Sequence, residues 1–348
     1  MSADSVPVSP PFSLLQSGAV SDDPAPVLPD PAAPLDRPEL PPVTALFAGQ
    51  AVANPGATAV RQGERALTYG ELAAAVSRLG GALVARGIEP GERVILYGRR
   101  SPGLVAGLLG VMAAGGAVLV VEPELPDERK ARMIEIAGAR RMFRVEPGAV
   151  PAWAADLDVV AIDPASGELL PAEEVSPVDL AAPRPGADPA YVFFTSGTSG
   201  SPKGVVGCFA GLSQFLLWER EELGIGPGDR GSQLTRLSFD AMLRDTFLPL
   251  VSGACLCLPR PEDETPSRVV RWLDREGITV LHAVPSLVRL WLDGARGGDG
   301  PPSELAALRW TLFTGEPLPG SLVRDWRRAF PRSGRQVNFY GPTETTLI

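Results

Sequence analysis

Helical and strand patterns alternate along most of this chain, and several of its strands are apolar on both faces. One unit consists of a strand at 93–97, a helix with Ser101 as its cap and Pro102 in its first turn, and a strand at 117–121. The segment Ala-Cys-Leu-Cys-Leu at 254–258 is an apolar strand of this kind. Such strands are typical of parallel sheets that helices cover on both sides. The sequence therefore predicts an α/β fold with a mostly parallel sheet.

The same alternation predicts the remaining elements. Thr68 and Glu71 have the spacing of a capping box and begin an amphipathic helix that Gly87 ends. Further helices are predicted at 127–137, 209–223, 241–251, 267–276, 286–293 and 320–330, and further strands at 158–163, 190–195, 254–258, 278–284, 309–314 and 336–340. Ligands of such sheets bind beyond the carboxyl ends of the strands, so functional residues are expected in the loops that follow strands.

Composition limits the classes of function. With 348 residues, 45% of them apolar, the chain can bury a sizeable core. No apolar run reaches the ~18 residues of a membrane span, and the N-terminus lacks a signal segment, so we expect a cytoplasmic protein without a membrane partner. A net charge of −9 without a basic surface argues against nucleic acid as a partner. Cys208, Cys255, Cys257 and the single histidine, His282, are too few for a disulfide framework or a zinc site.

Residues 1–42 differ in composition from the rest of the chain. They contain 11 of the 37 prolines and six acidic residues against one arginine. A segment of this kind buries too little apolar surface to offset its loss of chain entropy. We therefore predict a disordered, Pro-rich, acidic leader at 1–42 and a folded core at 43–348, with approximate subdomains at 43–189 and 190–348.

The most specific signal follows the apolar strand at 190–195. Residues 195–204 read Thr-Ser-Gly-Thr-Ser-Gly-Ser-Pro-Lys-Gly. Glycines let backbone N–H groups approach an anion, hydroxyls add donors, and Lys203, one of only two lysines, adds a compact positive charge. A nucleotide triphosphate fits this set, although the spacing of a Walker loop is absent. A flexible Ser/Gly surface linker is the structural alternative.

A second motif, Asn-Phe-Tyr-Gly-Pro-Thr-Glu-Thr-Thr at 338–346, follows the last predicted strand. It combines an amide for a purine edge, an aromatic ring for stacking, hydroxyls for phosphate and a carboxylate for Mg2+. A turn in which Thr and Glu cap the backbone is the structural alternative. The two motifs together predict a site for ATP and Mg2+.

A third segment, at 237–245, places Asp240 after Phe239 at a predicted helix start. A carboxylate there is also stabilised by the helix dipole, which is its structural interpretation.

These segments resemble motifs of the adenylate-forming (ANL) superfamily, and of amino-acid adenylation domains of the nonribosomal peptide synthetase type in particular. Residues 195–204 are similar to T-S-G-[ST]-T-G-x-P-K-G, with Ser199 in place of threonine, and 338–346 to N-x-Y-G-P-T-E-T-T. Residues 239–242 resemble F-D-x-S, with Met242 in place of serine, and 314–317 resemble the G-G-E segment. The resemblance implies an ANL-type large N-terminal domain with layered, mostly parallel sheets flanked by helices. No Y-x-[RT]-G-D motif, hinge or C-terminal lid follows, so we expect the domain to be incomplete at its C-terminus.

The resemblance also implies roles for individual residues. The catalytic residues would be Lys203, Thr195, Thr343 and Glu344, with Glu344 as the metal ligand. The phosphates would be bound by Thr195, Ser196, Gly197, Thr198, Ser199, Gly200, Lys203 and Thr343. The adenine slot would be formed by Asn338, Phe339, Tyr340 and Gly341, facing Gly315, Glu316 and Pro317. Asp240 would pair with the α-ammonium group of the substrate. The pocket for the substrate's side chain would be lined by Ala241, Arg244, His282, Leu312, Thr314, Phe339, Leu347 and Ile348.

Arg244 and His282 make this implied pocket polar, which favours a small hydroxylated or acidic substrate side chain. A hydrogen-bonded core histidine is the structural alternative for His282. For Arg244, together with Asp245, the alternative is a pair of ordinary charges on a helix surface.

The implied reaction is amino-acid adenylation, in which an amino acid and ATP-Mg give aminoacyl-AMP and pyrophosphate. In the complete protein, a phosphopantetheinylated carrier protein would then take the aminoacyl group as a thioester, and an MbtH-like protein is a candidate helper. From this chain alone we expect weak or no turnover. Two alternatives stay open: an acyl- or aryl-acid ligase of the same superfamily, and a non-catalytic interaction protein with an adenylation fold.

Overall fold

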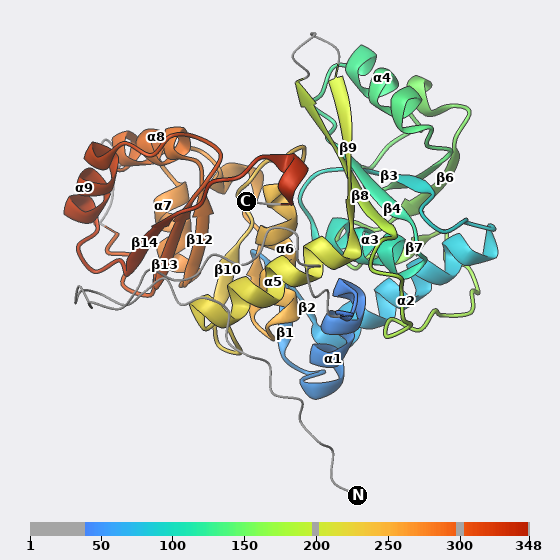
Figure 1. The fold of residues 1–348 in the computed structure, drawn as a ribbon, viewed down its shortest axis with the longest axis horizontal. Helices are drawn as coiled ribbons and strands as arrows, with labels where there is room; N and C mark the ends of the chain where they lie inside the picture. The colour runs from blue at the N-terminus through green and yellow to red at the C-terminus, as the bar shows by residue number, and fades with distance from the viewer. Residues whose placement is uncertain (1–38, 197–201, 297–302, 347–348) are drawn as a thin grey trace, which may run out of the picture. The chain divides into compact units, whose positions relative to one another are not determined.

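Most strands lie beside parallel neighbours in two sheets, shown in Figure 1. The computed structural model describes residues 39–196, 202–296 and 303–346. The strands of the first sheet are β3 (Arg93–Tyr97), β4 (Ala117–Val121), β5 (Arg141–Arg144), β6 (Asp158–Ile162), β7 (Leu169–Leu170), β8 (Pro189–Ser196) and β9 (Pro202–Cys208). Those of the second sheet are β1 (Thr58–Gln62), β2 (Arg65–Thr68), β10 (Arg230–Ser232), β11 (Cys255–Cys257), β12 (Val280–Ala283), β13 (Trp310–Phe313) and β14 (Arg335–Asn338).

The strand order follows from crossover connections through helices. Within the described residues, the first sheet has the order β7-β6-β5-β3-β4-β8-β9 and the second the order β14-β13-β12-β10-β11-β1-β2. Among the described strands, antiparallel pairing is confined to β1 with β2, β6 with β7, and β8 with β9. The helices are α1 (Val43–Ala53), α2 (Tyr69–Ala85), α3 (Pro102–Ala113), α4 (Asp127–Ala137), α5 (Phe209–Leu223), α6 (Ala241–Val251), α7 (Val269–Arg275), α8 (Pro285–Arg296) and α9 (Gly320–Ala329), with 3-10 turns η1 (Ala152–Ala154), η2 (Pro261–Asp263) and η3 (Thr343–Thr345).

The two faces of each sheet contribute to different cores. Leu96 of β3 packs with α1, α2, α3, α5 and α6, whereas its neighbour Ile95 packs on the opposite side, where α4 lies. In the second sheet, Leu312 faces the same central helices and Phe313 faces α7, α8 and α9. The core between the sheets therefore contains side chains from α1, α2, α3, α5 and α6. The predicted α/β fold with mostly parallel sheets flanked by helices is confirmed.

Local signals in the sequence explain several of the boundaries. Thr68 and Glu71 form the predicted capping box at the start of α2. Ser101 caps α3 by accepting a hydrogen bond from the backbone N–H of Leu104. The helices α4, α5 and α6 have the predicted bounds. These elements are decided by capping and apolar periodicity, so they could be found without tertiary information.

The elements that the sequence pattern missed are either short, largely polar, or apolar on every face. They include α1, the β1–β2 hairpin and β9. The strand β9 contains two glycines and several exposed residues, and it is extended because it pairs with β8 along its whole length. Its strand character is thus imposed by its partner.

The sheets do not divide the chain at residue 190. The strands β1 and β2 come early in the sequence but belong to the second sheet, and β8 and β9 lie near the chain's middle but belong to the first. Residues 40–348 form one compact unit by contact. The subdomain boundary stays a prediction, and the predicted leader at 1–42 falls almost wholly outside the described residues.

Glycine allows close packing of α2 against α3, and this contact can be tested. A methyl group at Gly110 of α3 would lie 2.8 Å from Cβ of Leu79 in α2. We expect Gly110→Ala to lower the free energy of unfolding by about 1–2 kcal/mol in urea denaturation, because overpacking outweighs the gain in helix propensity. The matched control is Gly49→Ala in α1, where nothing lies within 4 Å of the added methyl group. That variant should gain about 0.5–1 kcal/mol. Equal gains in both variants would contradict the close α2–α3 contact.

Candidate adenylation site

The hydroxyl- and glycine-rich loop joins two strands of one hairpin. In the pairing of β8 with β9, Thr195 is opposite Lys203 and Ser196 is opposite Pro202. Directly opposed residues project to the same face of an antiparallel pair, so the threonine and the lysine are neighbours at the base of the loop. Lys203 is exposed and Thr195 is half-buried. The residues between the strands, including the predicted phosphate-binding Gly197, Thr198, Ser199 and Gly200, lie outside the described residues.

The second motif leaves the edge of the second sheet and runs beside this hairpin. Asn338 ends β14, and the turn η3 begins at Thr343 and packs beside β9. Burial raises the pKa of Tyr191 in β8, and the neighbouring side chain of Thr346 offsets part of this increase. The side chain of Glu344 is exposed. Two segments about 140 residues apart in sequence, each from a different sheet, are therefore brought side by side.

Asp240 connects the third segment to the second. It is the N-cap of α6 and accepts a hydrogen bond of 2.9 Å from the backbone N–H of Ala241. The side chain of Thr343 lies beside its carboxylate, close enough to interact with it. Burial raises the pKa of Asp240, and these two neighbours and the charge of Arg244 offset this only in part. Asp240 thus has the capping role of the structural interpretation, and it also contacts the predicted α-phosphate residue.

Strand register decides which of the predicted pocket residues share a face. His282 of β12 is opposite Leu312 of β13, which in turn is opposite Val337 of β14. Side chains alternate along a strand, so Thr314 and Phe339 continue the same face two residues further on. Phe339 contacts Trp218 of α5, with ring centroids 6.0 Å apart. This face is therefore the one covered by α5 and α6.

A buried ionic cluster lies under this face. Nε2 of His282 is 3.1 Å from a carboxylate oxygen of Glu219 in α5, and Nδ1 is 3.1 Å from a carboxylate oxygen of Asp245 in α6. All three side chains are at most 2% exposed. The other oxygen of Asp245 accepts hydrogen bonds from the backbone N–H groups of Leu234 and Thr235, at 3.3 and 3.1 Å. Glu219 was not predicted, because a single glutamate in the run Trp-Glu-Arg-Glu-Glu gives no sign of burial.

The cluster favours the imidazolium form of His282. Burial and the charge of Arg244 lower its pKa, but the carboxylates of Glu219 and Asp245 raise it by more, so the pKa lies above its ordinary 6.5. Only the imidazolium can donate from both ring nitrogens, and each nitrogen faces a carboxylate. His282 therefore has the hydrogen-bonded core position of its structural alternative.

Arg244 is also buried, but it has no comparable partners. Its side chain is 0% exposed, and its guanidinium carbon lies 5.3 Å from the centroid of the Phe339 ring. Among the described residues, no group accepts a hydrogen bond from its Nε, Nη1 or Nη2. The alternative of ordinary helix-surface charges is wrong for Arg244 and Asp245, since both are fully buried in α6.

The remaining predicted residues occupy the ends of the strands. Gly315 follows β13 with φ +85, a conformation that glycine adopts without strain. The carboxylate of Glu316 accepts hydrogen bonds from the backbone N–H and the hydroxyl of Ser286, at 2.9 and 2.8 Å, at the start of α8. Asn338, Tyr340 and Pro317 are exposed, and Ala241 is half-buried. Leu347 and Ile348, predicted to line the pocket, lie outside the described residues.

Comparison with known proteins identifies the family. The family described as "AMP-binding enzyme" matches residues 47–348, which include all the motifs above. The chain belongs to the AMP-binding enzyme family.

Its relatives within this family are nonribosomal peptide synthetases. The chain is 33% identical over 313 residues to tyrocidine synthase 3 of Brevibacillus parabrevis, covering 87% of this chain and 5% of that protein. It is 32% identical over 302 residues to bacitracin synthase 3 of Bacillus licheniformis, covering 87% of this chain and 4% of that protein. Among solved structures, the AMPPNP-bound form of the nonribosomal peptide synthetase FmoA3 (S1046A) is 32% identical with a TM-score of 0.78, covering 89% of this chain and 32% of that one. The chain is thus homologous to synthetase adenylation domains and spans less than a tenth of the length of these curated relatives.

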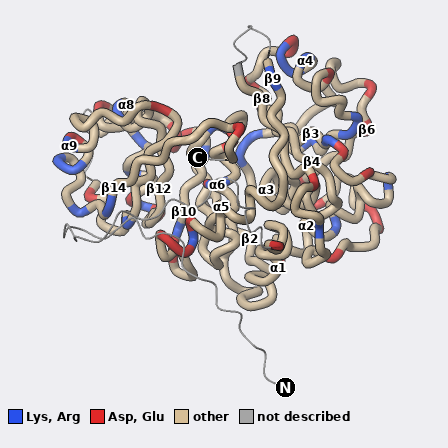
Figure 2. Tube along the Cα trace, in the orientation of Figure 1, with Lys and Arg blue, Asp and Glu red and all other residues tan. Residues whose placement is uncertain are grey.

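The described residues of this family member fit a nucleotide with its metal ion. Thr195 and Lys203 provide a hydroxyl and a cation side by side, and the neighbouring turn presents the exposed carboxylate of Glu344. No group of three or more His, Cys, Asp or Glu side chains in the described part of the chain is arranged to hold a metal ion. Carboxylate and phosphate oxygens are the ligands that Mg2+ prefers in nucleotide sites. Basic and acidic residues are interspersed along the described chain (Figure 2).

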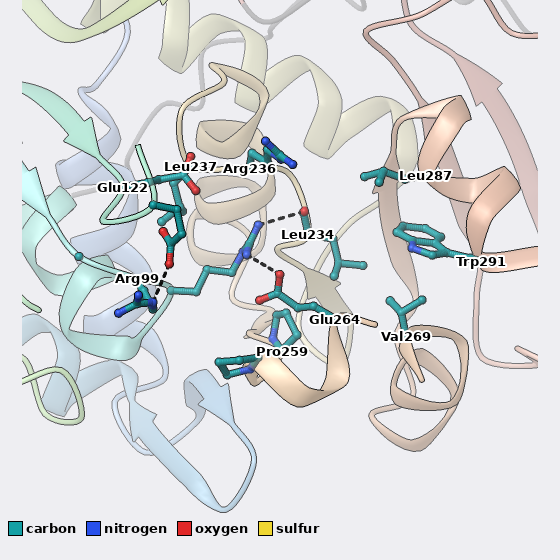
Figure 3. A pocket seen from close by; sticks show the side chains of 14 residues that line it. Arg99, Glu122, Leu234, Arg236, Leu237, Pro259, Glu264, Val269, Leu287 and Trp291 are labelled. Atoms are coloured by element: carbon teal, nitrogen blue, oxygen red, sulfur yellow. Dashed lines mark hydrogen bonds and ion pairs between the residues drawn. The ribbon is translucent and has the colours of Figure 1, made fainter. Parts of the chain in front are cut away.

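A separate cavity of about 480 Å3 opens where the loops after β3, β4, β10 and β11 meet. Figure 3 shows Arg99 and Glu122 on one side of it and Leu287 and Trp291 on the other. None of the sequence-predicted site residues lines this cavity. It was not expected from any motif, because loops from both sheets create it.

Arg100 connects the two sheets at this cavity. It follows β3 and donates hydrogen bonds to the side chain of Gln233 at 2.6 Å, to the backbone oxygen of Thr235 at 2.8 Å and to Glu264 at 2.8 Å. Gln233 and Thr235 follow β10 in the second sheet. Its place directly after a strand was the one signal in the sequence that could have pointed to it.

In the part of the chain that the structure describes, no helix has both the length and the apolar character needed to cross a membrane.

The raised pKa of His282 can be measured directly, because it is the only histidine of the chain. We expect its imidazole NMR signals to titrate above pH 6.5. The stability that the imidazolium contributes should be complete below pH 6.5 and should be lost as pH rises through the folded-state pKa. His282→Gln identifies the signals by their absence, and its stability should lack this loss. Titration at or below 6.5 would contradict the ionic cluster.

Proposed function

We propose that this chain is part of an enzyme that activates an amino acid with ATP-Mg, forming aminoacyl-AMP and pyrophosphate, with weak or no turnover from the chain alone. The observation that carries the proposal is the contact of Asp240 with Thr343. A carboxylate at that position would bind the α-ammonium group of the substrate, and the hydroxyl beside it would bind the α-phosphate. The substrate carboxylate would then lie between the two, next to the phosphorus atom that it attacks.

The chemistry requires positioning and charge neutralisation. An oxygen of the ionised substrate carboxylate forms a bond to the α-phosphorus, and the bond from that phosphorus to the bridging oxygen breaks as pyrophosphate leaves. No general base is needed, because the attacking group carries no proton. Groups that stabilise negative charge on the phosphates therefore supply the rate acceleration.

The hairpin and the turn would divide the nucleotide between them. Thr195 and Lys203, with the loop between them, would hold the β- and γ-phosphates, and Glu344 would hold Mg2+. Bound Mg2+ neutralises charge on the phosphate oxygens. The exposed ring of Tyr340, at 89%, offers a stacking surface for adenine, with Asn338 at its edge. Gly315 to Pro317 would form the opposite wall.

The identity of the relatives supports the wider function. The solved FmoA3 structures include one bound to α-methyl-L-serine-AMP, an aminoacyl adenylate, at 32% identity and a TM-score of 0.77. We infer that the aminoacyl group of this chain's product is passed to a phosphopantetheinylated carrier protein in the cytoplasm, with an MbtH-like helper as a further partner. The substrate of an acyl- or aryl-acid ligase has no ammonium group for Asp240 to bind. An amino-acid substrate is therefore favoured.

Asp240→Asn tests the choice of an amino acid. We expect it to weaken binding of aminoacyl sulfamoyl-adenosine analogues by about 10- to 100-fold, because a charged hydrogen bond to the ammonium group is lost. Binding of ATP-Mg, measured by calorimetry, should change by less than about threefold. Asp179→Asn is the matched control, since Asp179 is exposed and its hydrogen bond to the Ala181 N–H can be kept by asparagine. Unchanged analogue binding in Asp240→Asn, or pyrophosphate exchange with non-amino acids alone, would overturn the amino-acid assignment.

Lys203→Ala tests the phosphate loop. We expect adenylate formation in single-turnover assays of the complete protein to slow by about 100-fold, because one preorganised cation is removed from the phosphates. Binding of AMP should be unchanged, because AMP lacks the β- and γ-phosphates. Lys203→Arg should recover part of the rate. An equal loss of AMP and ATP binding would show that Lys203 acts on the fold or on another part of the nucleotide.

A further inference from the structure

Arg244 is a cation that is buried without hydrogen-bond acceptors. Its guanidinium carries five N–H groups, and none of its three nitrogens donates to any group in the described ranges. The side chain is 0% exposed, so its N–H groups are shielded from bulk solvent. Buried charged groups without hydrogen bonds are costly, and native proteins retain them chiefly where a ligand or a catalytic role requires them.

Two carboxylates lie near Arg244, and Oε2 of Glu219 and Oδ1 of Asp245 are themselves buried without a hydrogen-bond donor in the described part of the chain. Asp245 accepts from two backbone N–H groups through one oxygen and faces His282 through the other. Glu219 faces the second nitrogen of His282. This arrangement leaves the N–H groups of Arg244 without an acceptor among the described residues.

The position of Arg244 relative to Asp240 sets a direction for the substrate. The two residues are four apart at the start of α6, so they lie on the same face, separated by about 6 Å along the helix axis. Helical side chains lean toward the N-terminus, which brings the guanidinium toward the turn of Asp240. The ring of Phe339 lies against Arg244, and Thr343 contacts Asp240. The segment that follows β14 therefore runs along both residues. A substrate whose ammonium group is held by Asp240 would extend its side chain toward Arg244.

We propose that the amino acid activated by this chain has an anionic side chain, whose carboxylate pairs with the guanidinium of Arg244. The inference rests on the proposed adenylation function and on the role of Asp240 within it. A carboxylate accepts two parallel N–H groups from a guanidinium and neutralises its charge. A hydroxyl accepts fewer and leaves the charge in place. Both nitrogens of His282 face carboxylates, whereas the N–H groups of Arg244 have no acceptor among the described residues and can recognise an anionic side chain.

The test compares acidic substrates with their amides. The probes are the sulfamoyl-adenosine analogues of L-aspartate, L-glutamate and the next homologue, L-2-aminoadipate, against those of L-asparagine, L-glutamine and L-serine, with affinity measured by calorimetry. We expect one acidic analogue to bind the unmodified chain about 10- to 100-fold more tightly than its amide or the serine analogue. The acid and amide have nearly the same shape, so the ratio reports the charge contact.

Variants assign the preference to Arg244. Arg244→Gln should bring the acidic analogue and its amide within about threefold of each other, and Arg244→Lys should retain part of the preference, because lysine keeps the charge without the planar fork. Arg78→Gln is the matched control, an exposed arginine paired with Glu168, and should leave the ratio unchanged. Far-ultraviolet circular dichroism and thermal unfolding establish that each variant is folded, and the comparison on the unmodified chain decides the proposal if Arg244→Gln does not fold.

The outcomes separate this inference from the proposed function. Tighter binding of an amide or of the serine analogue would overturn the anionic substrate while leaving adenylation intact; an amide preference would point to the unpaired oxygen of Glu219 as the recognising group. A preference for the acid that survives in Arg244→Gln would overturn the role of Arg244. Failure of every analogue and of ATP-Mg to bind would instead overturn the adenylation function.

Discussion

The burial of α6 between the two sheets is the constraint on which the proposed site depends. Residues 242–251 of this helix are all buried, although they include an arginine, an aspartate and a threonine. Polar groups in such a position must find partners inside the protein. Asp245 finds them in His282 and in two backbone amides, whereas Arg244 does not. The burial of α6 therefore leaves the N–H groups of Arg244 without a hydrogen-bond acceptor among the described residues.

The proposed site is formed by segments at the edges of the two sheets, next to the N-terminus of α6. The first sheet contributes the β8–β9 hairpin, the second contributes the segment after β14, and the N-terminus of α6 lies against that segment through Asp240. Each part follows from a simple local rule: a hairpin places opposed residues together, a parallel strand releases its loop at the carboxyl edge, and a helix N-terminus accepts a carboxylate. Phosphoryl chemistry needs little more than this, because the reaction is accelerated by placement and charge.

Much of the fold and of the motif positions could be predicted from the sequence, since those features are local. The bounds of α4, α5 and α6 follow from capping and apolar periodicity, and the strand β3 from an apolar run. The strand β9 could not be recognised, because its glycines and exposed residues become a strand only through pairing with β8. Arg100 and its cavity were missed for a similar reason, as they depend on loops from two sheets.

The sequence by itself determined the family, the α/β class and the residue types suited to a nucleotide, because these are written in contiguous motifs and in short periodic patterns. Only the tertiary structure decided how these residues are used. It showed that Asp240 touches Thr343 across about 100 residues of chain, that His282 is enclosed by Glu219 and Asp245, and that Arg244 is buried without an acceptor. Burial and pairing are properties of distant segments brought together, and a linear pattern does not record which charge will be left unsatisfied.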